Sequence, residues 1–131
     1  MATIDRTIDF GGHSRKFRSK ASTAYTVGEL QKLSAGDNAI IDATTGAVLV
    51  GRCEEAKGSG DTANTPLLVT IVFRGDELRA TAAAGTVTNI GDPCDISSST
   101  QLTWTNTNTD FITVVVESSS QGIVVCQRTT Y

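Results

Sequence analysis

The stretch DFITVVVESSSQGIVVCQRT, residues 110–129, decides the fold class of this chain. It contains two runs rich in β-branched residues, 110–118 and 122–129, and the polar sequence SSSQG at 118–122 joins them. β-Branched side chains pack well on a pleated surface, and a short polar connection between two such runs is typical of a β-hairpin. The end of the chain therefore predicts an antiparallel pair of strands.

The composition extends this prediction to the whole chain. Of the 131 residues, 39% are apolar and 19% are charged, and Thr, Ser, Gly and Ala are abundant. Thr suits a half-exposed sheet and Gly suits turns, so we expect one all-β domain of short antiparallel strands, either a small β-barrel (β-tulip) or a sandwich. No apolar run approaches the roughly 20 residues of a membrane-spanning helix, and we expect no membrane partner.

The strongest single strand is LLVTIVF at 67–73, which is apolar on both faces and should be central in a sheet. Pro66 precedes it, where a strand can begin without losing a ladder hydrogen bond. Two apolar runs at 39–41 and 47–50 flank the turn-forming residues 42–46, so this segment predicts a hairpin.

Weaker patterns predict further strands around 25–29, 77–82 and 86–90. A short helix in the alanine-rich sequence ELRATAAAG, with Gly85 as its C-cap, is the alternative for the second of these. The polar sequence at 57–65 predicts a loop.

A glycine followed by an acidic residue recurs at 28–29, 36–37, 75–76 and 91–92. Gly adopts positive φ without steric cost, and an Asp side chain readily hydrogen-bonds the nearby backbone. We interpret these pairs as turns at the rim of a barrel or sandwich. They are not phosphate-binding loops, because none opens a helix and ends in Lys-Ser or Lys-Thr.

Residues 1–21 predict an extended N-terminal arm ahead of a barrel-like domain at 22–131. Residues 1–25 hold five basic and two acidic residues, a net charge of +3; the whole chain carries −3, so the remainder carries −6. This segregation indicates that the arm binds an acidic surface. The side chains expected to contact a partner protein or a neighbouring subunit are Ile4, Ile8, Phe10, Arg15, Lys16, Phe17, Arg18 and Lys20.

Few side chains offer catalytic chemistry. The single histidine, His13, lies in the arm, where we expect it in solvent or at an interface. Cys53, Cys94 and Cys126 are odd in number and far apart, so we expect reduced, half-buried thiols in a protein made in a cytosol. Neither zinc nor calcium spacing is present. We predict no enzymatic activity, no cofactor and no metal.

Two further features have structural interpretations. The sequence Arg74-Gly75-Asp76 spells a cell-adhesion tripeptide, but a turn at a strand end explains it. Trp104 stands alone in a Thr/Asn-rich sequence. We expect it to cap the core or to lie at a subunit contact, with stacking on a sugar or a base as the alternative.

Four phrases of the sequence resemble the capsid decoration, or cement, proteins of tailed double-stranded DNA bacteriophages. They are YTVGELQKL (25–33), AVLVGRCEEA (47–56), LLVTIVFRGDELRA (67–80) and GTVTNIGDPCDI (85–96). The resemblance implies a small β-barrel or β-tulip domain on the outside of the major capsid protein lattice. It also implies an N-terminal arm that runs along the shell, and frequent trimers. It supplies no catalytic residue.

The residues and the resemblance together predict a virion structural protein on the outer surface of the capsid. Its expected partner is the major capsid protein, and we expect a homo-oligomer, a trimer in preference to a dimer. The alternatives are another phage component, such as a tail or head-completion protein, and an OB-like nucleic-acid-binding module. The acidic domain argues against direct contact with nucleic acid. A small enzyme is the class that the sequence favours least.

Overall fold

A computed structural model describes residues 5–6, 13–36, 38–105 and 107–131. None of these residues is helical, so the described part of the chain contains no helix that could cross a membrane. The predicted all-β fold with a small barrel is confirmed. The strands are β1 (Asp5–Arg6), β2 (Ser14–Arg18), β3 (Leu30–Leu33), β4 (Ile40–Asp42), β5 (Leu49–Cys53), β6 (Pro66–Ile71), β7 (Glu77–Ala84), β8 (Pro93–Ile96), β9 (Leu102–Thr103), β10 (Phe111–Ser118) and β11 (Gln121–Cys126).

Strands β2 to β6 form the first unit, an antiparallel sheet with the order β2-β6-β5-β3-β4. The sheet is curled, because Ser19 after β2 forms a parallel bridge with Ile40 of β4, at the opposite end of the strand order. The ring of Phe17 packs against the apolar cluster of this unit. That cluster consists of Tyr25, Ile40, Val50, Cys53, Leu67 and Val69.

Strands β7 to β11 form the second unit, a closed barrel with the order β7-β11-β10-β8-β9. A parallel pairing of β9 with β7 closes the barrel. Strand β1 pairs with β7 on the same side as β9, with Asp5 opposite Arg79 and Arg6 opposite Leu78. The part of the chain expected to be an arm thus contains two strands, β1 and β2, and both pair with strands of the expected domain.

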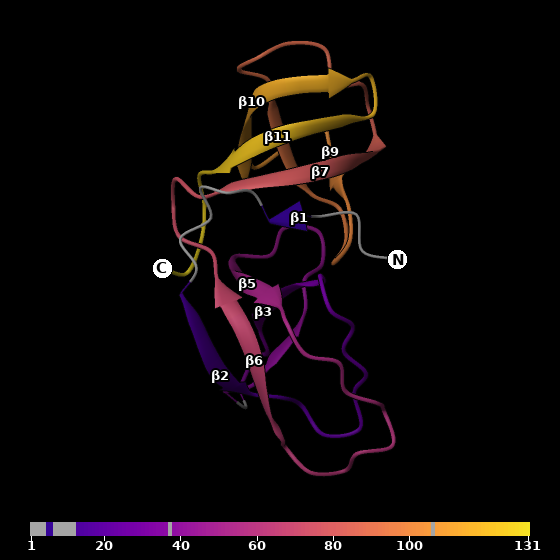
Figure 1. The fold of residues 1–131 in the computed structure, drawn as a ribbon, viewed down its shortest axis with the longest axis vertical. Coiled ribbons are helices and arrows are strands. Elements are labelled where there is room, and N and C mark those ends of the chain that lie inside the picture. Colours follow the sequence, from indigo (N-terminus) through magenta and orange to yellow (C-terminus); the bar gives the residue numbers. More distant parts are fainter. Residues whose placement is uncertain (1–4, 7–12, 37, 106) are drawn as a thin grey trace.

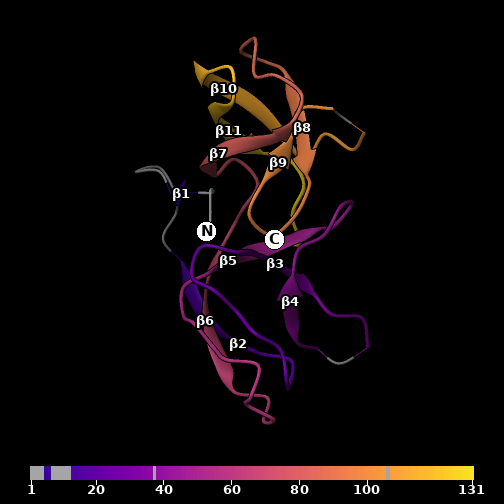
Figure 2. The same ribbon diagram turned by 90° about the vertical axis from the view of Figure 1, so that its right-hand side faces the viewer.

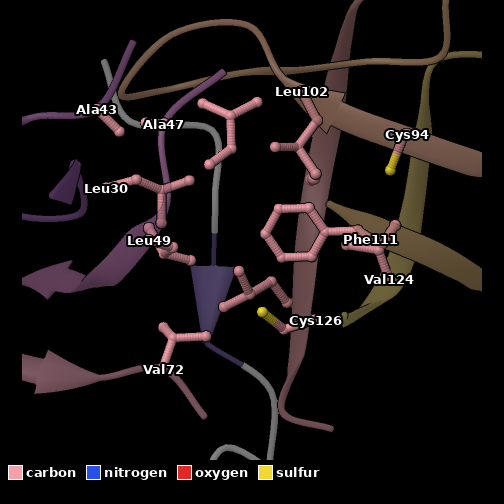
Figure 3. Packing of buried hydrophobic residues seen from close by; sticks show 13 residues of the cluster. Leu30, Ala43, Ala47, Leu49, Val72, Cys94, Leu102, Phe111, Val124 and Cys126 are labelled. Atoms are coloured by element: carbon pink, nitrogen blue, oxygen red, sulfur yellow. The ribbon is translucent and has the colours of Figure 1, made fainter. Parts of the chain in front are cut away.

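The two units are stacked along the long axis of the molecule (Figures 1 and 2). One apolar cluster joins them, with Phe111 of the barrel packed among side chains from both units (Figure 3). The C-terminal residues also connect the units, because the Thr129 hydroxyl donates to the carbonyl oxygens of Leu49 and Val72 at 2.8 and 2.6 Å. The junction is therefore a continuous core and not a flexible linker.

Several strand predictions are confirmed. The final hairpin is β10 paired with β11, and the LLVTIVF strand is β6, which lies between β2 and β5. The alanine-rich segment forms β7, so the alternative of a short helix is wrong. Its neighbours explain why, since pairing with β11, β9 and β1 satisfies the backbone in the extended form.

Three predictions are wrong. The segment 39–50 is not a hairpin, because β4 and β5 both pair with β3 and not with each other. Strand β3 lies between them, and the short turn after it makes the β3–β4 hairpin instead. The segments 25–29 and 86–90, predicted as strands, are not strands. Tyr25 forms only an isolated bridge with Lys57, and the strands begin at Leu30 and Pro93.

Candidate functional site

The described residues contain no pocket and no cluster of three His, Cys, Asp or Glu side chains that could hold a metal ion. A candidate site must therefore be found on the surface. The predicted contact residues point to β2, which is the outermost strand of the first unit beside β6 (Figure 1).

The register of β2 shows which of its backbone groups are free to bind. Two hydrogen bonds at the ends of β2 fix the pattern of its antiparallel ladder with β6. The Ile71 amide donates to the His13 carbonyl oxygen at 2.8 Å, and the Ser19 amide donates to the Thr65 carbonyl oxygen at 3.2 Å. Hydrogen-bonded and non-hydrogen-bonded pairs alternate in such a ladder, so odd-numbered residues of β2 face β6. The N–H and C=O groups of Ser14, Lys16 and Arg18 consequently face away from the sheet. Among the described residues, none pairs with this side of β2 between 14 and 18.

The side chains along this open edge are basic. Arg15, Lys16, Arg18 and Lys20 are all exposed. The Lys16 ammonium lies 2.7 Å from Glu55, but both side chains are well exposed, so this ion pair contributes little to stability. Of the predicted contact residues, the structure therefore brings these four together on one edge.

The structure does not place the other expected contact residues on this open edge. Phe17 packs inward on the core of the first unit and is not an exposed anchor. Ile4, Ile8 and Phe10 lie outside the described residues. Trp104 packs against the shared core, and its indole N–H donates to the Thr113 hydroxyl at 2.9 Å. Its predicted capping role is confirmed, and a subunit contact there stays a prediction.

Strand β2 is also a more regular open edge than β10. The outer half of β10 carries two register shifts, between Thr113 and Val115 and between Val116 and Ser118, and bulges of this kind discourage strand addition. Strand β2 has five residues in unbroken register with β6. A partner strand could therefore extend the first unit at β2 more readily than the barrel at β10.

The remaining polar motifs have structural roles. The glycines of all four Gly-acid pairs have positive φ, from 85° to 95°, as the turn interpretation requires. In the Arg74-Gly75-Asp76 turn, the Asp76 carboxylate accepts the Phe73 amide at 2.8 Å, so it is engaged by its own loop. The cysteines are free, as predicted, but they are fully buried and not half-buried. Cys94 and Cys126 belong to the apolar cluster that joins the units, and Cys53 belongs to the cluster of the first unit.

Sequence reasoning missed one buried electrostatic network. Burial raises the pKa of the Asp110 carboxyl, although the Ile96 amide, at 3.0 Å, and Arg128 favour its charged form. The Arg128 Nε lies 2.9 Å from this carboxylate and forms an ion pair with it. The pKa of nearby Asp95 is lowered, because backbone amides of the 107–110 loop outweigh its burial. Nothing in the sequence pattern marks these residues as partners.

Comparison with protein-family models gave no match for this chain, and comparison with curated protein sequences gave none either.

Proposed function

We propose that this protein is a capsid decoration protein, which binds the outer surface of a major capsid protein lattice and stabilises the head. The proposal takes the class of partner from the sequence resemblance. The observation that carries it on the structural side is the open, basic edge of β2 in an all-β protein whose described part has no pocket.

This edge suits binding to an acidic protein surface. Backbone groups of three residues are free to extend a sheet, and exposed sheet edges commonly bind extended segments in this way. The exposed cations Arg15, Arg18 and Lys20 add a charge preference that would speed encounter with an acidic partner.

Such binding would stabilise a shell without chemistry. A protein that binds only the assembled lattice favours assembly by its binding free energy. A copy that contacts several capsid subunits gains further through effective concentration. The expected localisation is the outside of the virion, and the expected homo-oligomer would increase this gain.

The test is co-sedimentation of the purified protein with shells that lack it. Truncation at Ala21 would remove β2 and the packing of Phe17, so charge-reversing substitutions at exposed positions give a cleaner comparison. The double variant R15E/R18E should lose binding. Arg74 is also exposed and lies outside β2, in the turn between β6 and β7, so R74E is the matched control and should bind as the parent protein does.

Failure of the parent protein to sediment with shells would overturn the proposal. Equal binding by R15E/R18E would show that the edge is not the contact. Binding to oligonucleotides that weakens with salt would favour the nucleic-acid module instead.

A further inference from the structure

The two units of the molecule have the same topology. Counted along the chain, both have the strand order first, fifth, fourth, second, third. In both, the third strand approaches the first in parallel, through Ser19 and Ile40 in the first unit and through β7 and β9 in the second. Figure 2 shows the two units one above the other.

Their registers also coincide residue by residue. In the first unit, Val69 lies opposite Arg15 on one side and Cys53 on the other. In the second, Val124 lies opposite Leu78 and Thr113. The registers make the following residues equivalent: Ser14 and Glu77, Arg15 and Leu78, Lys16 and Arg79, Ser19 and Ala82, Leu33 and Ile96, Ile40 and Leu102, Gly51 and Phe111, Cys53 and Thr113, and Ile71 and Cys126.

Backbone hydrogen bonds outside the strands repeat between equivalent residues. The Gly28 amide donates to Cys53, and the Gly91 amide donates to Thr113, both at 2.8 Å. The acids beside these glycines each accept the amide three residues earlier. Two more backbone hydrogen bonds recur. The bond from Ile71 to His13 in the first unit corresponds to the bond from Cys126 to Asp76 in the second. The bond from Ser19 to Thr65 corresponds to the bond from Ala82 to Ser120.

The sequence carries the same relation. Residues 8–33 align without a gap to 71–96, at a constant spacing of 63 residues. Of these 26 positions, six are identical, and the positions of Lys16, Val27, Glu29 and Leu33 carry similar residues in the second unit. The chain is therefore an internal tandem repeat of one five-stranded unit.

The repeat reveals one asymmetry. In the second unit, the outer side of the first strand is covered by β1, with Asp5 opposite Arg79. Lys16 is equivalent to Arg79, but no described strand covers it in the first unit. Among the described residues, the first unit thus has an open strand at the place where the second unit has a covered one.

We propose that β2 accepts an extended, antiparallel segment of a different protein in the position that β1 occupies on β7. The segment carries acidic side chains opposite Lys16 and Arg18, which lie on one face of the strand. Asp5 opposite Arg79 is the internal precedent for an acid at this place. The inference specifies the binding mode of the proposed function, and it rests on that function only for identifying the partner as a capsid subunit.

The described residues do not favour a second copy of this chain as the donor. They include one segment of this kind, β1, and it already pairs with β7, so they offer no spare strand for β2 of another copy. Direct pairing of two β2 strands is also disfavoured, because Arg15, Lys16 and Arg18 would face like charges.

The probe is a capped synthetic peptide of residues 2–9, ATIDRTID, added to the full-length protein without shells. With a Kd of about 1 mM, about 5 mM peptide should slow amide exchange at Lys16 and Arg18 about sixfold. Arg15 and Phe17 should change little, since their amides already bond to β6. The control peptide ATIKRTID, with D5K, should protect neither residue.

The variant K16P keeps every hydrogen bond of β2 to β6, because the Lys16 amide faces outward, but it should abolish protection by the peptide. Unchanged slow exchange at Arg15 and Phe17 shows that the variant is folded. Absence of protection in the parent protein, equal protection by both peptides, or protection at Arg79 through displacement of β1 would each overturn the inference. Shell binding is measured separately, so loss of one result leaves the other interpretable.

Discussion

Removal of the Arg128 side chain should destabilise the protein mainly by leaving a buried carboxylate without its cation. Asp110 is fully buried, and Arg128 lies 2.9 Å from it with about a third of its own side chain exposed. Arg128 also donates to the carbonyl oxygens of Gly46 and Ala47, at 2.8 and 3.3 Å, and so connects the barrel to the first unit.

The magnitude follows from these contacts. Removing one partner of a buried ion pair costs about 3–5 kcal/mol, and the partial exposure of Arg128 reduces this, so we expect R128A to lose about 2–3 kcal/mol at pH 7. R128K retains the charge without the planar fork and should lose about 1 kcal/mol. Denaturation in urea, followed by circular dichroism, measures both.

The pH dependence identifies the cause. Burial raises the pKa of Asp110 above its unfolded value, and loss of Arg128 raises it further. A carboxyl whose pKa is higher in the folded than in the unfolded state stabilises the fold at pH values below its unfolded-state pKa. That contribution is lost as the pH rises through its folded-state pKa. The loss in R128A should therefore shrink from pH 7 to about pH 4, where Asp110 binds its proton. An equal loss at both pH values would refute this explanation and leave only the lost packing and hydrogen bonds.

Three further predictions concern stability and thiol reactivity. G91A should cost about 1–2 kcal/mol in thermal unfolding because Gly91 has a φ of 94°, whereas G58A, at an exposed loop position, should be nearly neutral. W104F should cost about 1 kcal/mol, because it removes the hydrogen bond to Thr113; an unchanged midpoint in urea would contradict this. Burial raises the pKa of Cys53 to about 11 and of Cys126 to about 12, and also raises that of Cys94. The folded protein should therefore not react with a disulfide reagent at pH 8, and all three thiols should react in denaturant.

The sequence predicted the elements that depend on local pattern. The β10–β11 hairpin and the β6 strand have strong runs of β-branched residues. The two strands of the hairpin are adjacent in sequence, and β6 lies in the interior of its sheet. The 39–50 hairpin failed for a long-range reason. Strand β3 occupies the space between β4 and β5, and hydrophobic alternation does not report which strand lies between two others.

The candidate site was partly predictable. Basic residues in the first 25 positions drew attention to β2, but its role as an edge strand depends on pairing with β6, some 50 residues away. The repeat left a visible signal in the Gly-acid turns at 28–29 and 91–92, and comparison of the chain with itself at a spacing of 63 residues would have found it. The Asp110–Arg128 pair left none, since it depends on the fold of the barrel around residues 18 positions apart.

The pairing of β1 with β7 sets the valence of the molecule. A repeat protein with two equivalent open edges would be bivalent, and bivalent binders that meet multivalent surfaces form networks and aggregates. With the edge of β7 covered by β1, β2 is the one of these two equivalent strands that no described segment covers. If β2 binds as proposed, each molecule would take one segment at this strand, and binding would end when the surface is full.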